Sequence, residues 1–216
     1  MTRHHAPAGM TTKEFYFNHV QGLSNSGLTK VEDWLKGNMD KVIPEKAFRF
    51  GSMVDAMLTQ PDELEPDATD EELLKAIKVR DAIKSHPLGK VLLDQAEPQV
   101  ILTNEIRIEF EGIEKMVLAK CMYDGLLEKM RIGKDDKTTA ARTMAQFESI
   151  IDRFHYDRQA YWYMEVGQLD RFVFIGASKT KIGEVFIKII KRGDPLWLSG
   201  REKASALAYY SDVVVK

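Results

Sequence analysis

The sequence predicts an α/β fold in which a mixed central β-sheet is flanked by helices. Three observations support this prediction. Apolar residues recur at helical spacing through most of the first 97 residues. From Pro98 onward, apolar and polar residues alternate as in strands. Helical patterns then interrupt the strands, which is typical of a sheet covered by helices. We expect one domain over residues 1–216, with a mainly helical part over 1–97 and a sheet-containing core over 98–216.

The composition is that of an ordinary globular protein, with 44% hydrophobic and 30% charged residues. The single cysteine, Cys121, excludes an intramolecular disulfide framework and four-cysteine zinc or iron–sulfur sites. The apolar runs are too short to span a bilayer, and Met1 to Met10 lack the apolar segment of a secretory signal. We therefore expect a reduced, cytoplasmic protein that does not contact a membrane. The net charge of −2 weighs against binding nucleic acid by bulk positive charge, but leaves local recognition open.

Helical spacing and helix-start signals define the elements of the first part. Thr11 and Thr12 precede an apolar run, and Leu28 begins a second series of apolar residues at helical spacing. A break at His86-Pro87 separates the last two helices of this part. We expect an acidic loop over 60–70 and helices over 13–17, 28–35, 48–58, 71–85 and 87–95.

The second part combines both periodicities. Strands are indicated by runs rich in β-branched and aromatic residues, and helices by apolar residues three or four positions apart. We expect strands over 100–103, 106–110, 116–124, within 125–137, 172–175 and 184–190. We expect helices over 144–154, from 157 to at least 164, and over 195–210.

Asp124, Asp135 and Lys137 are the residues with the clearest chemical potential. Side chains alternate between the faces of a strand, so Asp135 shares a face with Lys137 while Asp136 points the opposite way. If the two strands are hairpin neighbours, Asp124 and Asp135 converge across the pair. Two carboxylates suit Mg²⁺, which activates a water and stabilises charge on a phosphodiester, and a nearby ammonium can orient that water. The alternative is a solvated turn with weak surface ion pairs.

Several segments together resemble the PD-(D/E)xK nuclease domain of RecE-type exonucleases (exodeoxyribonuclease VIII). The resemblance covers about residues 15–190. Its most specific part is Asp135-Asp136-Lys137-Thr138-Thr139 followed by Tyr156-Asp157-Arg158-Gln159-Ala160-Tyr161-Trp162-Tyr163. The other matching segments are Leu23–Leu28, Phe50–Leu58, Lys120–Gly125 and Phe172–Ile175.

The resemblance implies specific roles for five residues. Asp124 and Asp135 would bind Mg²⁺, for which Mn²⁺ could substitute, and Lys137 would be the catalytic lysine. Gln159 and Tyr163 match the family motif Q-x-x-x-Y and would help to place DNA near the site. Their spacing puts them on one face of a helix. The aromatic residues around them could instead simply pack in the core.

Asp55 departs from the family pattern, which has a metal-binding histidine at this position. An aspartate supplies a hard anionic oxygen that Mg²⁺ accepts at least as readily as imidazole, so Asp55 could complete the metal site. The alternative is that the site is lost and Asp55 is a surface residue. Basic side chains that could contact phosphates are Lys120, Arg142, Arg153, Arg158 and Arg171.

By resemblance, the protein is a Mg²⁺-dependent exodeoxyribonuclease of a bacterial or phage-infected cell. It would degrade one strand of linear double-stranded DNA from an end, 5′ to 3′. The product would be a 3′ single-stranded tail for phage-type recombination with a single-strand annealing protein, and the enzyme would form a homo-oligomeric ring. Three alternatives remain: an endonuclease of the same fold, an inactive module of this fold that binds DNA or protein, and a structural interaction protein.

Overall fold

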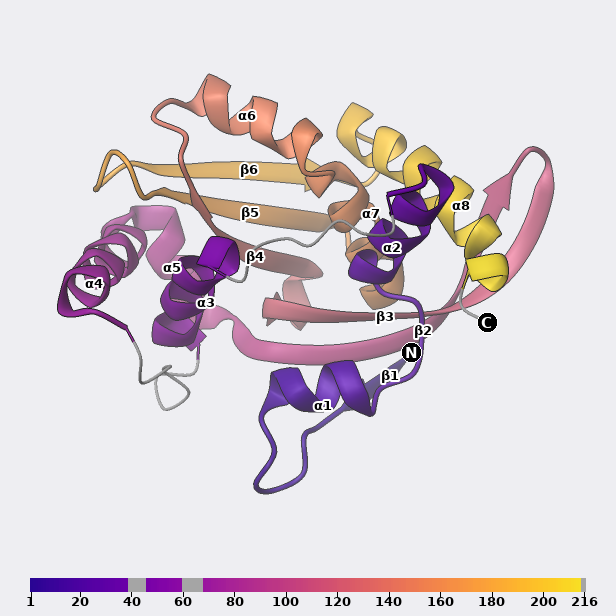
Figure 1. The fold of residues 1–216 in the computed structure, drawn as a ribbon, viewed down its shortest axis with the longest axis horizontal. Helices are drawn as coiled ribbons and strands as arrows, with labels where there is room; N and C mark the ends of the chain where they lie inside the picture. Colours follow the sequence, from indigo (N-terminus) through magenta and orange to yellow (C-terminus); the bar gives the residue numbers. More distant parts are fainter. Residues whose placement is uncertain (39–45, 60–67, 215–216) are drawn as a thin grey trace.

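The computed structural model describes residues 1–38, 46–59 and 68–214, and these form a mixed six-stranded sheet with helices on both faces (Figure 1). The strand order is β1-β2-β3-β4-β5-β6, in which β4 and β5 are parallel and the other neighbours antiparallel. The predicted fold class is therefore confirmed. The strands are β1 (Thr2–His4), β2 (Glu97–Phe110), β3 (Ile113–Leu127), β4 (Ile132–Thr139), β5 (Arg171–Ser178) and β6 (Val185–Lys191).

The expected helices are all present, with small shifts at their ends. Side-chain caps define several starts: Thr11 and Ser24 each accept a backbone N–H of the first turn, and Thr69 forms a capping box with Glu72. Residues 60–67 of the expected acidic loop lie outside the described residues. The helices are α1 (Thr12–Asn18), α2 (Asn25–Leu35), α3 (Lys46–Thr59), α4 (Asp70–Ser85), α5 (Pro87–Gln95), α6 (Met144–Arg153), α7 (Tyr156–Gly167) and α8 (Pro195–Val214).

The strands differ from the predictions in three places. The two strands expected over 100–103 and 106–110 are one strand, β2, because Asn104 and Glu105 continue the pairing with β3. β3 runs to Leu127, three residues beyond the expected end at Asp124, and a 3-10 helix, η2 (Glu128–Met130), separates it from β4. The short strand β1 was not predicted, because Thr-Arg-His has no apolar pattern and pairs along β2 through its backbone.

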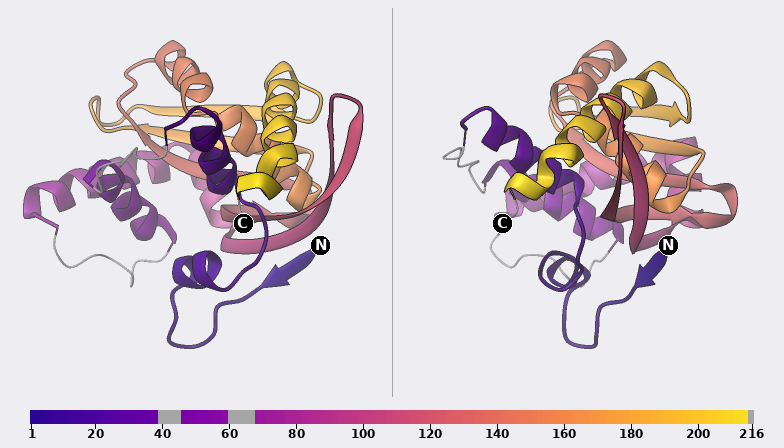
Figure 2. Two further views of the ribbon diagram at one scale, coloured as in Figure 1. Left: turned by 45° about the vertical axis from the view of Figure 1, so that its right-hand side comes forward. Right: turned by 90° about the vertical axis from the view of Figure 1, so that its right-hand side faces the viewer.

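Two helical layers enclose the sheet, as the views in Figures 1 and 2 show. On one face, α6, α7 and α8 pack against alternate residues of β5, such as Phe172 and Phe174. On the other face, α3, α4 and α5 pack against the intervening residues Val173 and Ile175. The continuous apolar run of this predicted strand thus supplies both layers, and β5 is buried on both faces.

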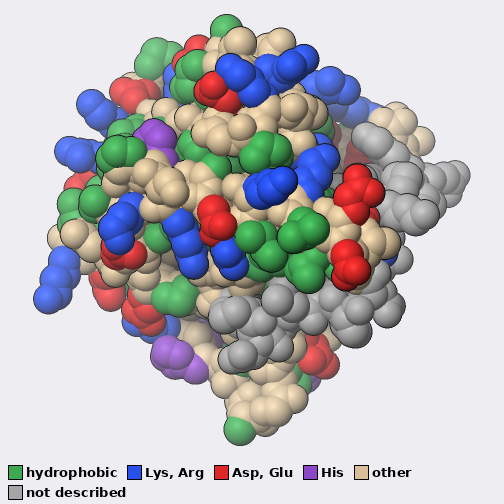
Figure 3. All heavy atoms as spheres, turned by 90° about the vertical axis from the view of Figure 1, so that its left-hand side faces the viewer, with side chains coloured by type: hydrophobic (Ala, Val, Ile, Leu, Met, Phe, Trp, Pro, Cys, Tyr) green, Lys and Arg blue, Asp and Glu red, His purple; other side chains and the backbone are tan. Residues whose placement is uncertain are grey.

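The described helices include none that combines the length and apolarity needed to cross a bilayer. Charges of both signs intermingle on the face that carries α4 and the turn between β5 and β6 (Figure 3). This mixture is in keeping with the net charge of −2.

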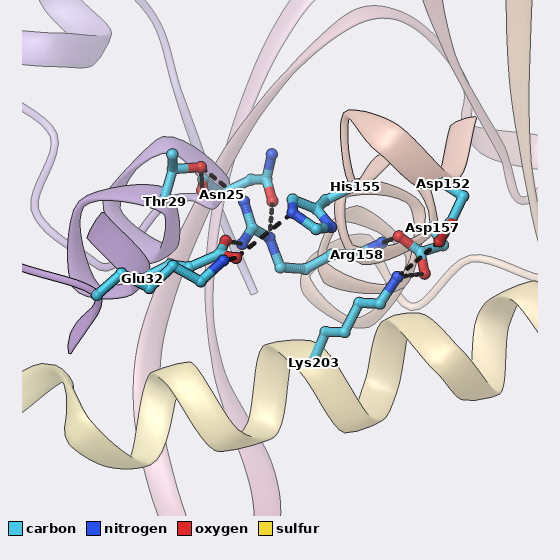
Figure 4. A network of polar contacts seen from close by, with 9 residues as sticks. Asn25, Thr29, Glu32, Asp152, His155, Asp157, Arg158 and Lys203 are labelled. Carbon is cyan, nitrogen blue, oxygen red and sulfur yellow. Dashed lines mark hydrogen bonds and ion pairs between the residues drawn. The ribbon is translucent and has the colours of Figure 1, made fainter. Parts of the chain in front are cut away.

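A buried arginine joins α2 to α7 (Figure 4). The Arg158 guanidinium donates to Asn25 Oδ1 at 3.1 Å, to Glu32 Oε2 at 2.7 Å and to Thr29 Oγ1 at 2.6 Å. On the preceding residue, Asp157 accepts from Lys203 of α8 at 2.7 Å. Arg158 is thus a structural tether, and its predicted contact with phosphate is wrong.

Lys120, a second candidate for phosphate contact, is also buried. Its Nζ donates to the carbonyl oxygens of Tyr16 and Val20, at 3.0 and 2.6 Å, and so fixes α1 to β3. A buried ammonium that already has these acceptors is unavailable to DNA. Cys121, the next residue, is fully buried and free, as expected for a small apolar core residue.

Gly125 lies where β3 packs very closely against β4 and against the end of α5. A Cβ atom here would lie 2.5 Å from Lys134 Cε and 2.8 Å from Ala96 Cβ. Gln99, on the neighbouring strand β2, has a left-handed φ of 52°. On β3, the usual alternation of side chains between the two faces of the sheet is interrupted between Tyr123 and Gly125. Tyr123 points to the α7 layer, whereas the side of Gly125 that lacks a Cβ faces Lys134.

We expect Gly125→Ala to destabilise the protein by about 1–3 kcal/mol, because Lys134 is buried and cannot move aside freely. Urea denaturation followed by circular dichroism measures the change. Met116→Ala, at an exposed position of the same strand, serves as the control and should change the stability by less than about 0.5 kcal/mol. Equal stability of Gly125→Ala and the unmodified protein would contradict the close packing.

Candidate active site

The candidate site lies where β3 and β4 separate. Their ladder pairs Gly125 with Lys134 and ends there, and Asp124 and Asp135 occupy the next position on each strand. The strands remain connected by one contact, in which the backbone N–H of Asp136 donates to Asp124 Oδ2 at 2.8 Å. The two carboxylates that the sequence singled out are therefore brought together at the point where the sheet opens.

Asp135 is held by two partners from different elements. Gln159 of α7 donates its Nε2 to Oδ1 at 2.5 Å, and the Lys137 ammonium lies 2.5 Å from Oδ2. Asp135 and Lys137 thus share a face of β4. Asp135 Oδ2 is buried, and the Lys137 ammonium is its partner. This oxygen can still accept a further ligand.

The opposite face of β4 carries a second ion pair. Lys134 Nζ lies 2.6 Å from Asp136 Oδ2, and both side chains are almost completely buried. Alternation along β4 places Asp135 beside Lys137, and it also places Lys134 beside Asp136. This second pair could therefore have been predicted from the sequence. The second oxygen of Asp136, Oδ1, is buried and has no donor.

Asp55 reaches the site from α3, which packs against β4. Its Oδ1 is also buried without a hydrogen-bond donor, so it is not a solvated surface residue. Burial first, and then the charges of Asp136 and Asp135, raise the pKa of Asp55 to about 6. The aspartate that stands at the family histidine position therefore lies within electrostatic reach of the other carboxylates.

Tyr163 and Tyr156 flank the site from α7. The Tyr163 ring packs edge-on against Tyr123 and Phe172, so it belongs partly to the core. Burial chiefly raises the pKa of Tyr163, and the charges of Asp135 and Asp124 contribute. The Tyr156 ring lies under Lys137, with Nζ 5.1 Å from the ring centroid. That contact was not predicted, because no local pattern relates a helix start to a strand 19 residues earlier.

The electrostatics of the site are those of crowded carboxylates. Burial raises the pKa of Asp124 well above its ordinary value, and Asp135, Asp55 and Asp136 raise it further. Burial would lower the pKa of Lys137, but the charges of Asp135, Tyr156 and Asp124 outweigh it and raise the pKa. Lys137 is thus a cation at neutral pH. The carboxylates around it outnumber the two lysines, Lys134 and Lys137, that can neutralise them.

The donor set fits a hard divalent cation. Among the described residues, two buried carboxylate oxygens, Asp55 Oδ1 and Asp136 Oδ1, have no donor, and carboxylate oxygens are the ligands that Mg²⁺ prefers. Within residues 1–38, 46–59 and 68–214, no three His, Cys, Asp or Glu side chains form a group that could hold a metal ion by themselves. Two carboxylates are instead neutralised by lysines, Asp135 by Lys137 and Asp136 by Lys134. Because Mg²⁺ keeps several waters, such a group is not required to hold it.

We expect Asp55→Asn to stabilise the metal-free protein at pH 8. The pKa of Asp55 is higher in the folded state, so its ionisation destabilises the fold; this penalty is absent below about pH 4 and complete above about pH 6. Removing the charge should increase the free energy of unfolding by about 1–2 kcal/mol. Thermal melts in EDTA at pH 8 and pH 4 measure this gain, which should be lost at the lower pH.

Glu105→Gln is the control for Asp55→Asn, because it removes the same charge at an exposed position of β2. It should leave the stability nearly unchanged at both pH values. A melting temperature of Asp55→Asn at or below that of the unmodified protein at pH 8 would show that the carboxylate is not under electrostatic strain.

The same arrangement of sheet and helices occurs in a solved structure of low sequence identity. A protein of Eubacterium rectale, provisionally assigned as an exonuclease, aligns over 96% of this chain and 88% of its own, with a TM-score of 0.62 and 18% identity. The chain therefore shares its mixed α/β fold with this protein.

Two further structures align less closely. They are a phage-related exonuclease from Haemophilus somnus (TM-score 0.46, 16% identity, 90% of this chain and 95% of that chain) and an alkaline exonuclease from Laribacter hongkongensis (TM-score 0.40, 16% identity, 93% of each chain). No family model and no curated protein matches the sequence.

Proposed function

We propose that the protein is a divalent-metal-dependent deoxyribonuclease that hydrolyses phosphodiester bonds. The observation that carries this proposal is the ion pair of Asp135 with Lys137 where β4 separates from β3, with Asp124 at the adjacent position of β3 and Asp55 within electrostatic reach. Buried acceptors that lack donors are costly for a fold, so their retention favours a functional role. The shared fold with a protein assigned as an exonuclease supports the same reading.

Each side chain has a defined part in the proposed reaction. Asp55, Asp124 and Asp135 would hold Mg²⁺ or Mn²⁺, which supplies Lewis-acid stabilisation of charge on the phosphate and a more acidic water. Lys137 holds its ammonium beside Asp135, where it can orient the attacking water and stabilise negative charge on the phosphate. Gln159 fixes the Asp135 carboxylate from α7. Tyr163 lies on the same helix, one turn farther along, where it can border the DNA.

We also propose the substrate and its context from the resemblance to RecE-type exonucleases. The substrate would be an end of linear double-stranded DNA, degraded 5′ to 3′ to leave a 3′ single-stranded tail. A single-strand annealing protein would receive that tail during phage-type recombination, and a homo-oligomeric ring would enclose the DNA. Enclosure makes prolonged digestion compatible with the near-neutral net charge, because the substrate is retained by topology.

Digestion of end-labelled linear duplex and of covalently closed circular duplex in Mg²⁺ tests the proposal. We expect loss of label from the linear DNA, no change in the circle, and no digestion in EDTA or by Asp135→Asn. Labelling the 5′ or the 3′ ends separately gives the polarity.

Other outcomes select among the alternatives. Cleavage of the closed circle would identify an endonuclease of this fold and show that the enzyme does not require a DNA end. DNA binding without metal-dependent cleavage would identify an inactive binding module. Neither binding nor cleavage would leave a structural interaction protein and overturn the proposed function.

A further inference from the structure

A column of three aromatic rings leads from the core to the surface beside Lys137. The Tyr156 ring stacks on Phe174 of β5, with centroids 5.1 Å apart and planes at 22°. Phe154 stacks on Tyr156, with centroids 6.1 Å apart and planes at 28°. Because Lys137 Nζ also lies over Tyr156, the outer ring of this column is one ring away from the proposed catalytic ammonium.

The outer ring, Phe154, is unusually exposed for a phenylalanine beside a buried site. Its exposed fraction is 56%, and the guanidinium of the exposed Arg153 lies over its ring, 5.5 Å from the centroid, so a base that stacks there must displace this mobile surface side chain. Between the two stacked residues, His155 has a left-handed φ of 54°. A histidine in this conformation is strained, and such strain is found preferentially at binding and catalytic sites. In this chain it places the rings of Phe154 and Tyr156 in one stack.

We propose that Phe154 is a stacking platform for an unpaired base of the DNA strand that enters the site. This inference rests on the proposed function, which supplies a strand with an end. An aromatic face stacks on any base, and Arg153 offers a cation to the neighbouring phosphate. Tyr156 cannot serve in this way, because it is half-buried and packs on Phe174, Phe154 and Lys137.

The chemistry of the platform also determines its selectivity. A phenyl ring has no hydrogen-bonding group, so it does not distinguish one base from another. A strand held by stacking and by phosphate contacts is therefore bound without regard to sequence. This is the selectivity that an enzyme needs if it digests DNA of any sequence from an end.

Phe154→Trp provides a direct test, because the indole reports stacking through its fluorescence. The probes are a 16-nucleotide oligothymidylate and an abasic oligodeoxyribose phosphate of the same length, in EDTA and low salt. We expect saturable quenching by oligothymidylate and little by the abasic strand. Phe17→Trp, at a similarly exposed position (53%) on α1, is the matched control and should be quenched by neither. The unmodified protein supplies the background of its three native tryptophans.

Affinity measurements complete the test. Phe154→Ala should weaken binding of oligothymidylate about tenfold, within the range of about 5- to 150-fold for loss of one stacked base. Binding of the abasic strand should change less than twofold. Phe154→Leu keeps an apolar side chain without a π-face and should behave like the alanine variant. Thermal melts of each variant show whether it is folded.

Two results would overturn the platform: equal quenching of the Phe154→Trp variant by both strands, or unchanged affinity of the folded Phe154→Ala and Phe154→Leu variants. The experiments distinguish a failure of the platform from a failure of the proposed nuclease function. A protein that is quenched selectively by oligothymidylate but never cleaves linear duplex retains the platform and loses the nuclease. A protein that cleaves linear duplex but shows no selective quenching retains the nuclease and loses the platform.

Discussion

Lys137→Met should reduce the single-turnover rate of DNA cleavage by about 10²–10³-fold, the effect of removing one charged donor from a preorganised site. Methionine keeps most of the aliphatic chain but removes the ammonium that lies beside Asp135 and over the Tyr156 ring. In the proposed reaction the ammonium acts on the water and on the developing charge, so the loss should appear in kcat, with DNA affinity changed much less. Single-turnover digestion with excess protein and filter binding in EDTA separate the two quantities.

The control for this variant is Lys90→Met, which removes a surface lysine of α5 that pairs with Asp94. It should cleave at the rate of the unmodified protein. Lys137→Arg should not restore the rate, because the planar guanidinium cannot take the place of a compact ammonium beside Asp135. If Lys137→Met is folded and cleaves at a normal rate, the lysine has no catalytic role.

Arg158→Leu should lower the free energy of unfolding by about 3 kcal/mol, because it leaves the polar groups of α2 without their buried partner. The three acceptors on Asn25, Thr29 and Glu32 all lose a donor (Figure 4). For a chain of this size, the melting temperature should fall by about 6–12 °C. Differential scanning calorimetry provides both quantities.

Arg131→Leu is the matched control for Arg158→Leu. It removes an arginine whose ion pair with Asp170 is exposed on both sides, so it should cost less than about 1 kcal/mol. Glu32→Gln in the Arg158→Leu background should recover part of the loss, since it removes the partly buried charge left behind. A loss no larger than that of Arg131→Leu would refute the structural role of Arg158.

Local periodicity predicted most elements, because helices and strands of this chain have clear apolar faces. It also predicted that Asp135 and Lys137 share a face, since alternation along one strand is a short-range property. It could not predict β1, which has no apolar pattern, or the join across Asn104 and Glu105 within β2.

The position of Asp55 could not be read from local pattern either. A helical period shows that Met53, Val54 and Met57 are buried, but not which strand lies beneath the helix. Only packing of α3 against β4 brings the Asp55 carboxylate towards Asp136 and Asp135. Similarly, Arg158 and Lys120 look like surface cations in the sequence, and their burial follows from partners on distant segments.

The run Lys134-Asp135-Asp136-Lys137 reads the same in either direction, and this symmetry has a consequence for folding. If β4 slipped by one residue against β5, every side chain would change face, yet each face would still receive one acid and one base. Charge alone therefore cannot distinguish the correct alignment from its neighbour. The discrimination must come from the uncharged positions, above all Gly133, where a Cβ atom would strike Tyr123 and Leu169. Random variation at that glycine should accordingly produce misaligned, inactive chains more readily than variation among the four charges.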